Sequence, residues 1–201
     1  MAWDTPADDK TVESVTLALK GNGFEVDVAK DRNDALEKLL ASIPEGSEVL
    51  TVASTTLDQI GGVEALNDSG RYVSVKKRFA DISDEKERFK ARKASAITQY
   101  AAGSVQAITE GGVLVDASAT GSQLAPYAYT ADHLVLVVGT QKIVKDLDSA
   151  LRRIKEYVVP LEHERMMKSY GTGTSLNKVL IYNRERPGRV KIILVKEKLG
   201  F

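Results

Sequence analysis

The chain has 201 residues, of which 43% are hydrophobic and 28% are charged. These values predict a single globular domain, residues 1–201, and argue against a disordered chain. Lys and Arg together number 28, as do Asp and Glu, so the formal net charge is zero. This balance argues against a broad surface for nucleic acid or an anionic membrane. The absence of cysteine excludes disulfides, thiolate nucleophiles and an iron–sulfur cluster ligated by this chain.

Neither a targeting signal nor a membrane span is predicted. The segment Met1–Lys10 is acidic and polar and lacks the apolar stretch of a secretory signal. The longest apolar run, Leu134–Val138, is far shorter than the roughly 20 residues that a membrane helix needs. We therefore expect a cytoplasmic protein.

Helical and strand patterns alternate along the first half of the chain. Val12, Val15 and Leu19 recur at helical spacing, and Gly21-Asn22-Gly23 ends this first helix. The alternation then continues with strands at 24–29, 49–53 and 72–75, helices that begin at Asp31 and Ser54, a small helix at 63–67, and a charged helix that begins at Ser83.

The second half adds antiparallel features. Residues 105–109 and 113–117 read as two strands joined by the tight turn Glu110-Gly111-Gly112, and 134–138 is the clearest buried strand. A helix is predicted at 146–158. Pro160 is expected to break or re-aim it before a further helix at 162–170. The end of the chain predicts a hairpin-like pair, 178–182 and 190–195, around Pro187-Gly188.

Strands that alternate with helices predict the α/β class. We expect a single Rossmann-like domain with a largely parallel sheet, helices on both faces and antiparallel hairpin additions. Its core would span roughly 47–158, with an N-terminal helical extension at 1–46 and a C-terminal helix and hairpin at 160–201.

In such folds, ligands bind at the carboxyl ends of the strands. Ser54 and Thr55 follow a strand and open a helix, so their hydroxyls and N–H groups would suit a phosphate or carboxylate. A plain helix cap is the alternative. Glu110 with Gly111 could supply a base, nucleophile or ligand clamp, whereas the alternative is a solvated hairpin turn.

Two further junctions are candidates for the same cleft. Gly121 and Ser122 lie in a run of small and hydroxyl residues, 117–123, that suits either an anion-binding nest or a capped connection. Gly139 follows the buried strand, and Lys142 could add a positive charge, although most lysines are solvated.

Two common sites are excluded by their patterns. Residues 170–178 lack the Gly-Lys-Ser/Thr order of a phosphate loop, and a strand follows rather than a helix. The alternative for this segment is a loop that closes over a small ligand. His133 and His163 have no metal-ligand spacing, so no metal site is expected.

Several ordered segments resemble the LUD (lactate-utilisation) family. They are Gly103–Val115 with its Thr-Glu-x-Gly turn, Gly121, Val137–Val144, Asp146–Ile154, and the earlier Ser54–Gly61. The resemblance implies the fold of the ribose-5-phosphate isomerase, sugar-phosphate deaminase and CoA-transferase superfamily. CoA transferases of this fold use a glutamate before a glycine-containing turn, a context similar to that of Glu110. Where the family often ends its last strand in Asn-Gly-Arg, this chain has Val195–Lys198, which departs from the lactate-specific pattern.

The resemblance implies a component of organic-acid utilisation, in the oxidation of L-lactate to pyruvate, that binds a small anionic metabolite and works with iron–sulfur protein partners. Because the chain has no cysteine, any redox cofactor would belong to a partner. The alternatives are a stand-alone isomerase- or transferase-like enzyme with Glu110 as nucleophile or base, and a non-catalytic ligand-binding or assembly subunit. A homodimer is expected only because homodimers are common among soluble proteins.

Overall fold

The computed structural model describes residues 3–201 and is built around a six-stranded parallel sheet in the order β1-β10-β7-β4-β2-β3. Every neighbouring pair in this sheet is parallel. The α/β class and the largely parallel sheet are therefore confirmed. The strands are β1 (Glu25–Ala29), β2 (Glu48–Thr51), β3 (Val73–Ser74), β4 (Thr98–Gly103), β7 (Ala131–Gly139) and β10 (Val190–Val195).

A smaller mixed sheet contains four strands in the order β8-β5-β6-β9. The predicted hairpin is confirmed, because β5 and β6 pair antiparallel across the turn at Gly111 and Gly112. Strand β8 pairs parallel with β5, and β9 pairs antiparallel with β6. The strands are β5 (Ala107–Thr109), β6 (Leu114–Ser118), β8 (Ile143–Val144) and β9 (Lys178–Tyr182).

The helices begin at caps that the sequence contains. Asp8, Asp31, Ser54 and Asp146 each accept a hydrogen bond from an N–H group of the first helical turn that follows. The helices are α1 (Asp9–Gly21), α2 (Arg32–Ala41), α3 (Thr55–Gln59), α4 (Gly62–Asn67), α5 (Lys77–Ala80), α6 (Glu85–Ala94), α7 (Leu147–Arg153) and α8 (Val159–Tyr170).

Apolar layers stack on both faces of the large sheet. Helices α2, α3 and α4 pack on one face, where Leu39, Leu57 and Leu66 are fully buried. Helix α1 and the inner face of the small sheet pack on the other, the latter through Ile108 and Leu114. The outer face of the small sheet packs against α7. The small sheet therefore covers part of the second face, whereas helices were expected on both faces.

The prediction of a C-terminal hairpin is wrong. Strands β9 and β10 lie in different sheets, with β9 at an edge of the small sheet and β10 between β1 and β7. The residues of β10 are almost entirely buried, as a central parallel strand requires, whereas Val179 and Ile181 of β9 stay partly exposed. The turn at Pro187-Gly188 connects the two sheets.

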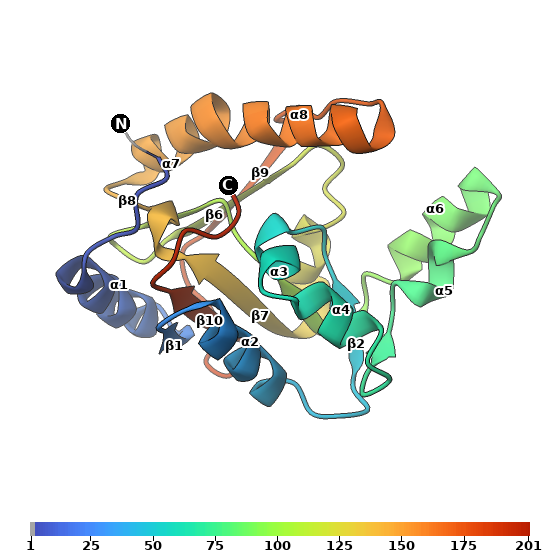
Figure 1. The fold of residues 1–201 in the computed structure, drawn as a ribbon, viewed down its shortest axis with the longest axis horizontal. Coiled ribbons are helices and arrows are strands. Elements are labelled where there is room, and N and C mark those ends of the chain that lie inside the picture. The colour runs from blue at the N-terminus through green and yellow to red at the C-terminus, as the bar shows by residue number, and fades with distance from the viewer. Residues whose placement is uncertain (1–2) are drawn as a thin grey trace.

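Pro160 does not break the helical path. The chain stays helical from α7 through a π turn, Ile154–Val158, into α8 (Figure 1). In that wider turn the Val159 N–H donates to the Ile154 carbonyl, and Pro160 follows in the first turn of α8, where a missing N–H is tolerated.

Helices α5 and α6 project from the body of the molecule (Figure 1). Helix α6 has no buried residue, and its cap is Asp84 rather than the expected Ser83. Phe89 on this helix is 56% exposed. No helix among residues 3–201 is both long enough and apolar enough to cross a bilayer.

Candidate functional site

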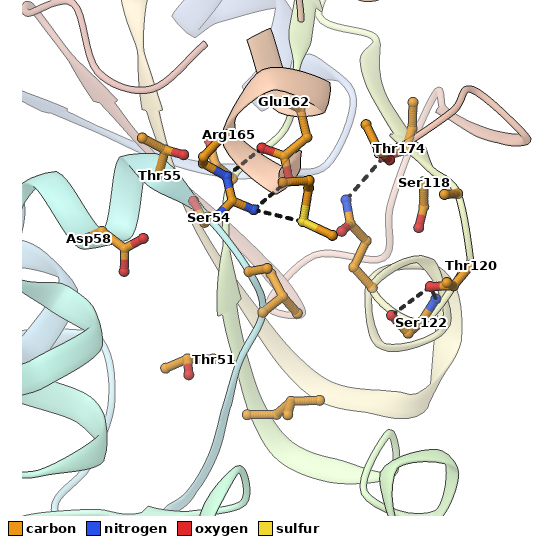
Figure 2. Close-up of a pocket in the computed structure, with 18 of the residues that line it drawn as sticks. Thr51, Ser54, Thr55, Asp58, Ser118, Thr120, Ser122, Glu162, Arg165 and Thr174 are labelled. Carbon is orange, nitrogen blue, oxygen red and sulfur yellow. Dashed lines mark hydrogen bonds and ion pairs between the residues drawn. The ribbon is translucent and has the colours of Figure 1, made fainter. Parts of the chain in front are cut away.

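A cavity of about 1020 Å³ opens at the carboxyl ends of the parallel strands. The chain leaving β2, β4 and β7 supplies Ser54, Ser104 and Lys142 to its wall. The end of β6 and the segment after it supply Ala117–Thr120, Ser122 and Gln123. Helices α6 and α8 complete the rim. Figure 2 shows Ser54, Thr55 and Asp58 on one side, facing Ser118, Thr120 and Ser122 across the opening. This is the edge at which ligands bind in open α/β sheets.

Lys142 forms part of the cavity wall and is only 3% exposed. The short 3-10 helix after β7, Thr140–Lys142, turns its side chain inward. The Nζ atom donates to Thr56 Oγ1 and to Ser104 Oγ, each over 3.0 Å. Burial lowers the pKa of the Lys142 amine to about 7, and the nearby charge of Arg153 adds to this effect while Asp116 opposes it.

Ser104 is held in place by Tyr127. The Tyr127 hydroxyl accepts from the Ser104 N–H and donates to the Ser104 carbonyl, each over 3.0 Å. Tyr127 is 1% exposed, and burial raises the pKa of its hydroxyl well above the usual value, so the hydroxyl stays protonated. Ser104 therefore has a fixed backbone from which its side chain can meet Lys142.

Asp116 lies on β6, behind the cavity wall, and is 1% exposed. Its Oδ2 accepts from Gln123 Nε2 over 2.9 Å, and its Oδ1 has no hydrogen-bond partner. Burial raises the pKa of this carboxyl to about 7, against the hydrogen bond from Gln123 and the positive charge of Lys142. An acid and an amine that both titrate near neutral pH thus lie near one cavity, a common property of functional sites.

Cationic side chains outnumber anionic ones around this cavity. Arg92 Nη2 donates to Ser122 Oγ over 2.6 Å and so connects α6 to the segment after β6. Arg165 on α8 is paired with Glu162, as Figure 2 shows. The cations on the wall are Lys76, Lys86, Arg88, Arg92, Lys142 and Arg165, and the acidic residues are Asp58, Glu85 and Glu162. This excess of positive charge favours an anionic ligand.

Half of the residues that the sequence proposes for the site line this cavity. They are Ser54, Thr55, Ser122 and Lys142. Ser54 also caps α3, since its Oγ accepts from the Leu57 N–H over 3.2 Å. The two interpretations of that segment, a cap and a ligand-facing hydroxyl, therefore apply together.

The structure does not bring Glu110, Gly111, Gly121 or Gly139 to the cavity wall. Glu110 and Gly111 lie on the exposed turn of the β5–β6 hairpin, beside α1. Asn22 Nδ2 fixes that turn by donating to the Gly111 carbonyl over 3.0 Å. The solvated-turn interpretation of Glu110 therefore fits the structure, and the expected grouping of Glu110 with Ser54 and Lys142 does not occur.

Two backbone N–H groups of the segment 117–123 donate hydrogen bonds to side chains of the same segment. The Gly121 N–H donates to Ser118 Oγ over 2.9 Å, and the Ser122 N–H donates to Thr120 Oγ1 over 3.3 Å. These N–H groups are therefore not free to form an anion-binding nest, and the capped-connection interpretation describes them. Gly139 has backbone torsions of ordinary extended chain and packs against Glu197 and Leu199.

Sequence reasoning missed Thr56, Ser104, Asp116 and Gln123. For Thr56, Ser104 and Gln123 the available signal was their position near a strand end or helix start, whereas Asp116 lies in the middle of β6 and had no such signal. The loop 171–177 contributes Thr174 to the wall and is held by His163. Within residues 3–201, no group of three or more His, Cys, Asp or Glu side chains could hold a metal ion.

A scan against protein-family models matches residues 12–195 to the LUD domain. The match covers most of the chain and includes every cavity-lining segment except the last two residues. The chain belongs to the LUD-domain family. The predicted family resemblance is thereby confirmed. No match to this LUD-domain chain was found among curated proteins.

A solved structure confirms the fold of this LUD-domain chain. It is the crystal structure of a DUF162 family protein from Deinococcus radiodurans, with a TM-score of 0.60 and 10% sequence identity. The similarity covers 94% of this chain and 99% of that one. At such low identity the likeness shows a shared fold, and function has to be argued from the site.

Proposed function

We propose that this LUD-domain chain is a component of organic-acid utilisation that binds a small carboxylate, of the lactate or pyruvate type, in the cavity at Lys142. The observation that carries the proposal is a buried lysine on the wall of an open cavity with excess positive charge, in a chain of the lactate-utilisation family. A carboxylate that approaches Lys142 meets an amine that Thr56 and Ser104 hold in place. Charge-assisted hydrogen bonds of this kind are strong in a partly desolvated site.

Oxidation of a 2-hydroxy acid releases two electrons, which this chain has no cysteine-ligated cluster to accept. We therefore propose that iron–sulfur partner proteins take up the electrons. The alternative enzyme with Glu110 as nucleophile has no support from the cavity, because Glu110 does not line it.

Ligand binding is tested by thermal unfolding of the purified chain with lactate, pyruvate, glycolate, sugar phosphates, CoA thioesters and nucleotides. A ligand at about 100 times its Kd stabilises the folded state by roughly 2.7 kcal/mol, which is readily measured. We expect a shift with lactate or pyruvate that is lost in Lys142→Met. The matched control is Lys145→Met, three residues along and exposed, which should keep the full shift. Stabilisation by nucleotides or sugar phosphates alone would contradict the carboxylate proposal.

The cellular role is tested by deleting the gene in the source organism. We expect growth on L-lactate to be lost and growth on pyruvate to be retained, and Lys142→Met to fail to restore growth. Lactate-dependent growth that survives the deletion would contradict the proposed pathway while leaving the ligand-binding result to stand by itself.

A further inference from the structure

Lys142 has an unusual set of partners for a buried lysine. Buried lysines are normally paired with a carboxylate. Among residues 3–201, no carboxylate forms an ion pair with Lys142, whose Nζ contacts two hydroxyl groups instead. Asp116, the acid whose charge raises the pKa of Lys142, is hydrogen-bonded to Gln123.

The two hydroxyl groups act as hydrogen-bond acceptors towards the Lys142 amine. Thr56 Oγ1 donates its hydrogen to the Leu199 carbonyl, and Ser104 Oγ donates to the Val105 carbonyl, each over 3.3 Å. Both hydroxyl oxygens are therefore acceptors towards Lys142. A neutral amine has two N–H groups and one lone pair. In the neutral form the two hydroxyls accept from both N–H groups, and the lone pair has no hydrogen-bond donor among residues 3–201.

We propose that Lys142 is a covalent carbonyl-binding residue, whose amine forms an imine with a 2-oxo acid that enters the cavity. The inference rests on the proposed function, because it uses the same cavity, and a 2-oxo acid is what oxidation of a 2-hydroxy acid produces. The cations on the cavity wall favour the carboxylate of such a compound. Its carbonyl carbon is the electrophile that the free lone pair can attack.

The reaction balances without any other reactant. The Nζ atom forms a bond to the carbonyl carbon, and the two amine hydrogens pass, through solvent in the cavity, to the carbonyl oxygen. That oxygen leaves as water, and a C=N bond replaces the C=O bond. No electrons are transferred between molecules, so the step needs no oxidant or reductant.

The electrostatic surroundings support a neutral amine at physiological pH. Burial and the charge of Arg153 on α7 lower the pKa of Lys142 to about 7, and the charged form of Asp116 on β6 acts in the opposite direction. The neutral amine is therefore well populated near pH 7, whereas an exposed lysine is almost wholly protonated.

The test traps the imine in the wild-type protein. The chain is incubated with pyruvate and sodium cyanoborohydride, digested, and analysed by mass spectrometry. Reduction of the imine leaves a mass increase of one pyruvate less one oxygen atom on the modified lysine. We expect Lys142 to be modified at least tenfold faster than Lys145, which is exposed and serves as the internal control. Because the wild-type peptides are compared, the result does not depend on whether a Lys142 variant folds.

Four outcomes separate this inference from the proposed function. Selective modification of Lys142, with a rate that rises through pH 7 and then levels off, supports the inference. Modification of Lys145 and other exposed lysines at equal or higher rates overturns it. If pyruvate raises the unfolding temperature but leaves Lys142 unmodified, the inference fails and the proposed carboxylate site stands. If pyruvate and lactate produce neither effect, both fail.

A second variant tests the role of the hydroxyl partners. Ser104→Ala keeps the amine but removes one of the two acceptors, so an N–H of the neutral form loses its partner. We expect slower trapping at Lys142 with unchanged trapping at Lys145. Equal trapping at Lys142 in the variant and the wild type would contradict the assigned polarity of the hydroxyls.

Discussion

The Tyr127 hydroxyl bridges the two backbone groups of Ser104, accepting from its N–H and donating to its carbonyl, each over 3.0 Å. The two residues lie 23 positions apart in the chain, and the pair places the Ser104 side chain against Lys142. Removal of this single oxygen would leave two polar backbone groups of Ser104 without their partner.

Tyr127→Phe should therefore lower the free energy of unfolding by about 1–3 kcal/mol, the usual cost of leaving buried polar groups unsatisfied. It should also weaken binding of the cavity ligand, because Ser104 is no longer fixed. Urea unfolding measures the first effect and ligand-dependent thermal shifts the second. Tyr129→Phe is the control, since Tyr129 is 85% exposed, and it should change neither quantity. Equal stability of the two variants would contradict the role of the bridge.

Gly103→Ala should destabilise the fold through steric overlap. A Cβ atom at Gly103 would lie 1.8 Å from the Tyr127 hydroxyl oxygen and 2.5 Å from Val52 Cγ2. Overpacking of this kind costs about 1–3 kcal/mol, and here it also displaces the hydroxyl that holds Ser104. Gly111→Ala is the matched control, because its Cβ would meet only Thr109 Oγ1, at 3.7 Å. Similar unfolding midpoints for the two variants would show that the cavity wall adapts at no cost.

Glu110→Gln should leave ligand binding unchanged. Glu110 is exposed on the β5–β6 turn and does not line the cavity, so its charge contributes little there. We expect the Kd for the cavity ligand to stay within about twofold of the wild-type value, which titration calorimetry measures; such a change is worth only about 0.4 kcal/mol. A loss of affinity of more than tenfold would show that Glu110 contributes to ligand binding.

Asp116→Asn should change how stability depends on pH. The pKa of Asp116 rises from 3.8 to about 7 on folding, so the folded chain holds a proton that the unfolded chain releases between these values. Stability contributed by this group is therefore full below pH 3.8 and falls as the pH rises to about 7. Lys142 has the opposite effect at higher pH. Its pKa falls from 10.5 to about 7 on folding, so its contribution to stability increases as the pH rises from about 7 to 10.5.

The variant should match the wild type near pH 4 and become progressively more stable than it between pH 4 and 7. Urea unfolding at a series of pH values measures this difference, and comparison of the two proteins at each pH cancels the other titrating groups. A difference that stays constant from pH 4 to 7 would mean that Asp116 has the same pKa in the folded and unfolded chains.

Arg189→Met should be the most destabilising of these changes. The Arg189 guanidinium is buried, donates to the carbonyls of Pro126, Tyr127 and Ala131, and is ion-paired with Glu185. Its loss leaves Glu185 without its charged partner, and breaking such a buried pair costs about 3–5 kcal/mol. Arg186→Met, at an exposed position three residues earlier, should shift the unfolding midpoint little. Equal effects of the two substitutions would contradict this role for the Arg189 network.

The sequence alone determined the features that depend on local spacing. Helices begin directly after Asp31, Ser54 and Asp146, close to the predicted starts, because a helix cap is made with residues two or three positions away. The strand at 134–138 and the hairpin turn at 110–112 were equally predictable, from a buried apolar run and from two adjacent glycines. The resemblance to the LUD family follows from such segments in order.

Only the tertiary structure decided which strands pair and which side chains meet. The sequence predicts that β9 and β10 pair with each other, but they belong to different sheets. Burial across the whole fold, rather than the turn between them, selects how these strands pair. The sequence proposes Lys142 for the cleft but does not predict that it is buried. It is buried because its partners Thr56 and Ser104, 86 and 38 residues away, come from two other strand ends of the same sheet. Such contacts have no local signature, since side-chain periodicity specifies a face and not the residue that lies opposite it.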